Sequence, residues 1–166
     1  KVLQSRGEMG YPYIFFTDNA NNGAADVYKD KKLPIYASNL CTEIMLPSNH
    51  DWSFVCVLSS INVLHYDKWK DTDAVETMIY FLDAVITEFL EKLEAYKNSD
   101  NRDDQQTFLF MERAYNFSKE NRALGMGVLG WHSLLQSKML PFDSQESYDL
   151  NSEVFKKIKE NSNKAS

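Results

Sequence analysis

Three polar residues with different chemistry alternate in the stretch SNLCTEIMLP, residues 38–47. Asn39, Cys41 and Glu43 carry an amide, a thiol and a carboxylate. If the backbone is extended here, alternate side chains project to the same side and the three groups lie near one another. The carboxylate can then take a proton from a hydroxyl, the amide can donate and accept hydrogen bonds, and the thiol can act as a nucleophile or, once oxidised by one electron, abstract hydrogen. Such a trio could hold a polyol substrate.

The alternative for Cys41 is an unreactive thiol in a loop, because free cysteine commonly packs as a small core residue. Spacing alone favours this alternative. The second cysteine, Cys56, lies in the apolar, β-branched run Ser53–Val63, which predicts a strand buried on both faces with Cys56 inside the core. Two cysteines make no disulfide framework, so each thiol is either a buried group or a chemically active one.

The elements that must hold these residues are predicted to be strands and a loop. YPYIFFTD, residues Tyr11–Asp18, is aromatic and β-branched and predicts a buried strand ending in a turn. Ile35–Ala37 follows a proline and is expected to be extended. Residues 38–47 are too irregular for a helix, so a strand end followed by a loop is predicted there.

Helices are predicted for the later part of the chain. Apolar residues at helical spacing predict a helix over Thr72–Tyr96. A second helix is predicted over Gln105–Phe117, a third that starts among the glycines of residues 125–130, and a last one over Ser144–Glu160. Strands followed by helices indicate an α/β or α+β protein rather than a helical bundle.

Other catalytic and binding motifs carry less weight. GMGVLG, residues 125–130, matches the G-x-G-x-x-G of dinucleotide-binding folds, but the polar, helix-like FSKENRAL stands where the preceding strand should be. Close helix packing or a tight helix entry is therefore favoured, with a nucleotide-binding module as an alternative. His50, His65 and His132 have no spacing that would collect them around a metal. No Gly-x-Ser-x-Gly nucleophile elbow is present.

Charge and hydropathy argue against two classes of partner. The 166 residues carry a net charge of −6 without a basic stripe, so no nucleic acid is expected as a direct partner. No apolar segment approaches the roughly 20 residues that span a bilayer, so no membrane association is expected and a cytoplasmic location is predicted. The chain begins with Lys1 and enters structured-looking sequence at once, which suggests a piece of a longer polypeptide.

The motifs SNLCTEIMLP, FVCVLSSINV and NRALGMGVLGWHSLL, in this order, resemble the catalytic core of the large (alpha) subunit of class I ribonucleotide reductase, in particular the T-even-type bacteriophage version. The resemblance covers nearly all of the chain. It implies an α/β fold: a helix-rich partial segment of the family's ten-stranded α/β barrel, including the central finger loop. Residues 1–166 would be a fragment of the catalytic barrel domain, with strands and finger loop over 11–63 and mainly helices over 72–160.

The same resemblance implies roles for four residues. Cys41 matches the thiyl radical that removes the 3′ hydrogen of a ribonucleoside diphosphate, and Glu43 matches the general base toward the 3′ hydroxyl. Asn39 matches the amide that hydrogen-bonds the substrate ribose. Cys56 matches one of two redox-active cysteines that reduce the substrate as the 2′ hydroxyl leaves as water. The partner cysteine of Cys56 is absent from this sequence.

The resemblance also implies what the segment works with. No cofactor or metal is expected on the segment itself. The whole enzyme would use a metal-radical cofactor in a small subunit, ATP and dNTP effectors, and thioredoxin or glutaredoxin as reductant. Expected partners are the remaining large-subunit segments, the small subunit, the diphosphate substrate and a second large subunit in a homodimer, in the host cytoplasm if phage-encoded. The isolated chain is predicted to be inactive, and a non-catalytic remnant of the same subunit is the alternative.

Overall fold

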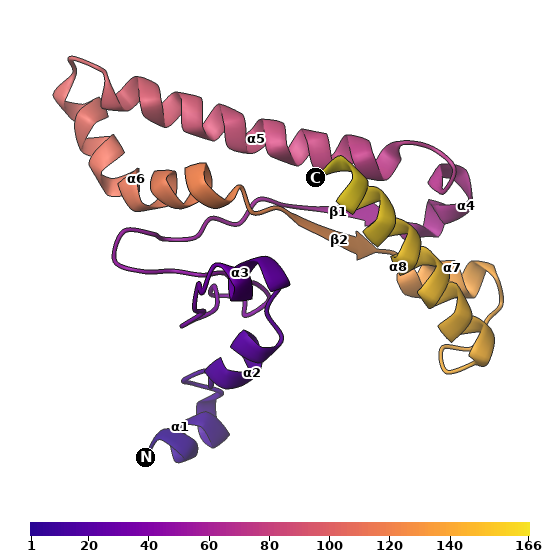
Figure 1. Ribbon diagram of the computed structural model, residues 1–166. Helices are drawn as coiled ribbons and strands as arrows, with labels where there is room; N and C mark the ends of the chain where they lie inside the picture. Colours follow the sequence, from indigo (N-terminus) through magenta and orange to yellow (C-terminus); the bar gives the residue numbers. More distant parts are fainter. The chain divides into compact units, whose positions relative to one another are not determined.

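The computed structural model describes residues 1–166, which divide into two compact units, Lys1–Phe54 and Val55–Ser166 (Figure 1). The first unit contains three short helices: α1 (Val2–Met9), α2 (Thr17–Asn22) and α3 (Asp26–Asp30). Loops make up the rest of it, including residues 38–47, hereafter the Cys41 loop. The loop predicted for this segment is confirmed, whereas the strand end predicted at its start is wrong, because the first unit contains no strand.

The strand predicted over Tyr11–Asp18 is wrong. Residues 11–16 form no regular element, and α2 begins at Thr17. The aromatic side chains of Tyr11, Tyr13 and Phe16 are exposed rather than buried. A strand needs a hydrogen-bonded neighbour as well as β-forming residues, and the first unit contains no strand that could pair with this one. Strands are correspondingly fewer over residues 11–63 than expected.

The second unit is built around a small parallel sheet of two strands, β1 (Leu58–Asn62) and β2 (Gly125–Leu129). Leu58 pairs with Gly125, and Asn62 pairs with Leu129. A 3₁₀ turn, η1 (Val63–His65), and a short helix, α4 (Tyr66–Trp69), follow β1. Four longer helices complete the unit: α5 (Ala74–Lys97), α6 (Arg102–Asn121), α7 (Trp131–Ser137) and α8 (Gln145–Ala165). The helices predicted over 72–96, 105–117 and 144–160 are thus confirmed, with shifted ends.

The third predicted helix is α7, but it begins after the glycines, at Trp131, because residues 125–129 form strand β2. Small residues let β2 approach β1 closely: a Cβ on Gly125 would collide with the Leu58 side chain, and one on Gly127 would lie 3.0 Å from Ser60 Oγ. Gly130 has φ of +80°, a left-handed conformation that glycine adopts without strain. Gly125 and Gly127 therefore serve sheet packing, and Gly130 serves as the N-cap of α7, so the predicted tight helix entry is confirmed at this one glycine.

The main core of the second unit lies where β1, η1, α4, α5, α7 and α8 meet. Its buried members are apolar or aromatic: Ile61, Val63, Tyr66, Val75, Leu134, Val154 and Ile158. These residues are scattered over nearly 100 positions of sequence, so the core requires both strands and all of these helices to assemble. Burial of this apolar surface is the principal force that holds the sheet in place.

Helices α5 and α6 run side by side as a hairpin (Figure 1). Leu93, Phe108 and Tyr115 form a second buried cluster between them. The Tyr115 hydroxyl donates to the Glu94 carboxylate, which holds the pKa of Glu94 below its ordinary value. This cluster and the hydrogen bond between Tyr115 and Glu94 hold the two helices together near the turn that connects them.

Arg122, at the junction between α6 and β2, forms hydrogen bonds with residues in the middle of α5. It ends α6 with a left-handed backbone, φ of +43°. Its guanidinium donates to Asp83 Oδ1 at 2.8 Å, to the Asp83 carbonyl at 3.0 Å and to Thr87 Oγ1 at 2.7 Å. These bonds fix the point from which β2 starts, three residues further along the chain.

Candidate functional site

The Cys41 loop turns sharply at its tip. The Thr42 N–H donates to the Asn39 carbonyl at 3.1 Å, which closes a turn over residues 39–42 with Cys41 at its third position. Thr42 has φ of +65°, and its hydroxyl donates to the Cys41 carbonyl at 2.7 Å. The Cys41 thiol is exposed, and Leu40 beside it is 87% exposed. The tip is therefore open to a ligand or to another polypeptide segment.

The Asn39 side chain stabilises this turn by hydrogen bonds to residues on its far side. Its Nδ2 donates to Glu43 Oε1 at 2.7 Å, and its Oδ1 accepts from the Ile44 N–H at 2.9 Å. The Asn39 N–H also donates to the Ile44 carbonyl at 3.2 Å. One amide side chain thus bonds both the carboxylate and the backbone on the far side of the turn.

The predicted proximity of the amide and the carboxylate is confirmed, but the reason given for it is wrong. Asn39 and Glu43 do not meet as alternate residues of an extended strand. They meet because the chain reverses between them, which brings residues i and i+4 to hydrogen-bonding distance. Cys41 lies at the reversal between the two groups, and it is exposed rather than the buried loop thiol of the alternative reading.

The base of the loop is held more firmly than its tip. Ile35, just before the loop, is 1% exposed, and Pro47 at the end of the loop is fully buried. Asn21, in α2, bonds both backbone groups of Ile35. The sequence analysis did not identify Asn21, because in the asparagine-rich stretch NANNG nothing in the sequence distinguishes it from its neighbours.

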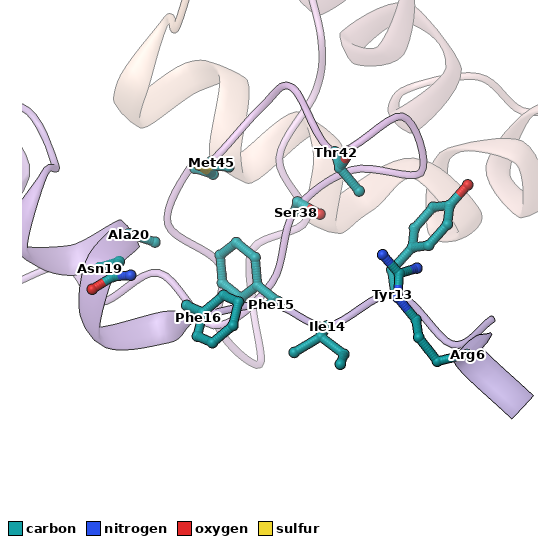
Figure 2. Close-up of a pocket in the computed structure, with 10 residues that line it drawn as sticks. All are labelled: Arg6, Tyr13, Ile14, Phe15, Phe16, Asn19, Ala20, Ser38, Thr42 and Met45. Atoms are coloured by element: carbon teal, nitrogen blue, oxygen red, sulfur yellow. The ribbon is translucent and has the colours of Figure 1, made fainter. Parts of the chain in front are cut away.

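A cavity of about 630 Å³ adjoins the loop within the first unit. Figure 2 shows Ser38 and Thr42 of the loop on one side of it and the Phe15 and Phe16 rings near α2. Arg6 contributes its guanidinium, which also stacks over the Tyr13 ring at 5.9 Å. The size lies in the range of small-molecule sites, and the lining combines aromatic surface with hydroxyl, amide and guanidinium groups.

Cys56 belongs to the second unit, and its predicted burial is wrong. The thiol is exposed, and β1 begins two residues later, at Leu58. The ladder with β2 begins at Leu58 because β2 itself begins only at Gly125, whose N–H donates to the Val57 carbonyl at 2.9 Å. Cys56 therefore lies exposed just before the sheet, outside any regular element.

Other chemistry is sparse in the structure. No group of three or more His, Cys, Asp or Glu side chains is arranged to hold a metal ion. His50 is exposed beside Asp51, with 3.1 Å between Nδ1 and Oδ1. No helix has both the length and the apolar character needed to cross a membrane. The two exposed free thiols, Cys41 and Cys56, and the hydrogen-bonded Asn39–Glu43 pair are the predicted site residues that the structure describes.

One family of known proteins is similar to this chain over its whole length. The whole chain, residues 1–166, matches the family model described as ribonucleotide reductase, barrel domain. A solved structure, the Actinobacillus ureae class Id ribonucleotide reductase alpha subunit, is 52% identical and superposes with a TM-score of 0.83, over 99% of this chain and 29% of that one.

Two viral relatives are named as large subunits of ribonucleoside-diphosphate reductase. The protein of Frog virus 3 (isolate Goorha) is 38% identical over 159 residues, which cover 96% of this chain and 26% of that protein. The protein of Invertebrate iridescent virus 3 is 32% identical over 159 residues, which cover 95% and 23%. The chain belongs to the ribonucleotide reductase family and is a segment of the barrel domain of its large subunit. It spans about a quarter of the length of these curated relatives.

Proposed function

We propose that this chain supplies the finger loop and part of the barrel wall of a class I ribonucleoside-diphosphate reductase large subunit. The supporting observation is the turn that places an exposed Cys41 between Asn39 and Glu43, with the latter two joined at 2.7 Å. A radical on a thiol has to be open to substrate, and a base has to be held close by. The activity is that of the complete enzyme and needs the other large-subunit segments.

In the proposed reaction each residue has a separate task. The Cys41 thiyl takes the 3′ hydrogen atom of a ribonucleoside diphosphate, so that an S–H bond forms, the C3′–H bond breaks and the unpaired electron moves to C3′. Glu43 accepts the 3′ hydroxyl proton, while Asn39 bonds the ribose and orients Glu43. The 2′ hydroxyl leaves as water after taking a proton from the reducing thiol pair, and at the end Cys41 returns its hydrogen atom to C3′ and becomes a thiyl again. Two electrons come from Cys56 and a second cysteine outside this chain, which become a disulfide.

The partners and cofactors of the complete enzyme follow from this proposal. A small subunit generates the radical with its metal cofactor, ATP and dNTPs act as effectors, thioredoxin or glutaredoxin returns the disulfide to the dithiol, and the large subunit is a homodimer. We place the enzyme in the cytoplasm. A more specific kinship with the T-even-type bacteriophage version stays a prediction, since the relatives named above come from other viruses and a bacterium.

The test uses the large subunit that contains residues 1–166, assembled with its small subunit. Cys41→Ser is expected to abolish formation of deoxyribonucleotide while leaving the dissociation constant for substrate nearly unchanged, because the radical carrier is lost and the main binding groups are kept. Retained turnover in this variant would overturn the assignment of Cys41.

A second variant separates the reducing thiol from the radical thiol. Cys56→Ser is expected to remove multiple turnover supported by a dithiol reductant. Normal steady-state kinetics in this variant would contradict the role of Cys56. If both variants were active, the non-catalytic remnant would become the better description of this segment.

A further inference from the structure

The Asn21 side chain connects α2 to Ile35, in the irregular segment before the Cys41 loop, by donating one hydrogen bond and accepting another. Its Nδ2 donates to the Ile35 carbonyl at 2.8 Å, and its Oδ1 accepts from the Ile35 N–H at 2.9 Å. Nδ2 also donates to the Thr17 carbonyl at 2.9 Å, one turn back in α2. The side-chain amide satisfies both backbone groups of Ile35, as a neighbouring strand would do.

This connection matters because Ile35 is the point where the chain leaves the interior for the loop. Ile35 is 1% exposed, whereas Tyr36 and Leu40 are 63% and 87% exposed. No strand pairs with the segment between Ile35 and Asn39. The direction in which the loop departs is therefore determined at Ile35, by burial of its side chain and by the two bonds from Asn21.

The turn beyond this point behaves as one piece. Asn39 ties Glu43 and Ile44 together across the reversal, with bonds of 2.7 and 2.9 Å. Because these hydrogen bonds hold the turn rigid, a displacement at its base moves the whole turn and is not taken up within it. A change in the path of the chain at Ile35 would consequently move Cys41 and Glu43 together, with the geometry of the turn itself preserved.

We infer that Asn21 is a positioning residue for the reaction at Cys41, which sets where the thiol stands relative to the bound ribose without touching the substrate. The inference rests on the proposed function and extends it to a residue outside the loop. An amide is required here because it has to donate and accept at once, on a single backbone residue. Neither alanine nor aspartate can do both.

The experiment compares Asn21→Ala and Asn21→Asp in the same assembled enzyme, with ordinary substrate and with substrate deuterated at C3′. A misplacement on the order of 1 Å lowers turnover about 10²-fold, so a fall of that order is expected for Asn21→Ala. Because hydrogen transfer then limits the rate, the deuterium isotope effect on kcat should increase. Asn21→Asp keeps the acceptor for the Ile35 N–H but lacks the donor. Its turnover and its isotope effect are therefore expected to lie between those of Asn21→Ala and those of the unmodified enzyme.

Asn98→Ala is the matched control. Asn98 at the end of α5 also uses an amide Nδ2, donated to the Glu94 carbonyl at 2.9 Å, and it has no part in the Cys41 loop. This variant should retain the isotope effect and the turnover of the unmodified enzyme. A similar increase of the isotope effect in Asn98→Ala would count against a specific role of Asn21.

The isotope effect distinguishes positioning from mere stability. Partial unfolding of Asn21→Ala would reduce the amount of active enzyme and the turnover, but it would leave the isotope effect unchanged, and that result would overturn the inference. Full activity in Asn21→Ala would overturn it as well. Activity in Cys41→Ser would instead overturn the proposed function. Failure of the inference about Asn21 and failure of the proposed function can therefore be told apart.

Discussion

Asn39 and Glu43 are joined by a hydrogen bond of 2.7 Å across the turn whose tip carries Cys41. The bond leaves the second carboxylate oxygen of Glu43 available to a substrate hydroxyl, while the first is held by an amide. The same Asn39 side chain bonds the Ile44 N–H at 2.9 Å. The Glu43 carboxylate and the loop backbone are thus oriented by one residue, and the two effects can be separated by substitution.

Glu43→Gln should keep the turn and remove the base. A glutamine oxygen can still accept from Asn39 Nδ2, but it does not take a proton from a hydroxyl at neutral pH. General-base catalysis contributes typically about 10²–10⁴-fold, so kcat of the assembled enzyme should fall by that order. Steady-state kinetics with a ribonucleoside diphosphate measure the change, and turnover equal to that of the unmodified enzyme would disprove the role of base.

Asn39→Ala and Asn39→Asp should differ in the protection of one backbone amide. Asp keeps an oxygen that can accept from the Ile44 N–H, whereas Ala has none. Hydrogen exchange at Ile44 should therefore accelerate in Asn39→Ala and remain closer to that of the unmodified chain in Asn39→Asp. Equal exchange in all three proteins would show that the side chain does not brace the turn.

Gly130→Ala should destabilise the second unit more than Gly125→Ala. A Cβ at Gly130 would lie 2.5 Å from Asn62 Oδ1, and the residue has φ of +80°, a conformation that costs other residues about 1–2 kcal/mol. The Leu58 side chain that faces Gly125 is half exposed and can rotate away. Denaturant unfolding measures both variants.

Gly7→Ala is the control for these two changes, because no atom lies within 4 Å of a Cβ added there. It replaces a helical glycine with a better helix former, so no loss of stability is expected. Equal losses for Gly125→Ala and Gly130→Ala would contradict the argument from backbone conformation.

Tyr66 should make stability fall at alkaline pH. Burial of the ring, followed by the 2.9 Å bond from its hydroxyl to Glu153, raises the pKa of Tyr66 from 10.0 to about 12. A pKa raised in the folded state contributes stability that is complete below pH 10.0 and is lost as pH rises to about 12. The free energy of unfolding should decrease over this interval.

Comparison of the unmodified chain with Tyr66→Phe isolates this contribution, because the other tyrosines titrate in both proteins. Tyr66→Phe should show a smaller decrease in the free energy of unfolding between these pH values, and its absorbance titration should lose one group with a pKa of about 12. An identical slope in the two proteins would show that Tyr66 ionises as it does in the unfolded chain.

Much of the helical part of this protein could be predicted from the sequence. The apolar spacing of α5 and the position of α8 follow from periodicity, which is a local property. The chemical importance of Asn39, Cys41, Glu43 and Cys56 was likewise suggested by the residues and by the family that their motifs resemble. Membership of that family is confirmed by the comparisons, while the roles of the four residues stay predictions.

The sequence by itself determined which residue types are present, which segments can be helical and which family the chain resembles. Only the tertiary structure decided which β-forming segments find a partner: Leu58–Asn62 pairs with a glycine-containing strand more than 60 residues away, whereas Tyr11–Asp18 pairs with nothing. It also decided that Asn39 meets Glu43 through a turn and that Asn21 bonds Ile35. A hydrogen bond between segments further apart, such as that from Asn21 to Ile35, leaves no periodic pattern in the sequence, because it requires the surrounding chain to be folded first.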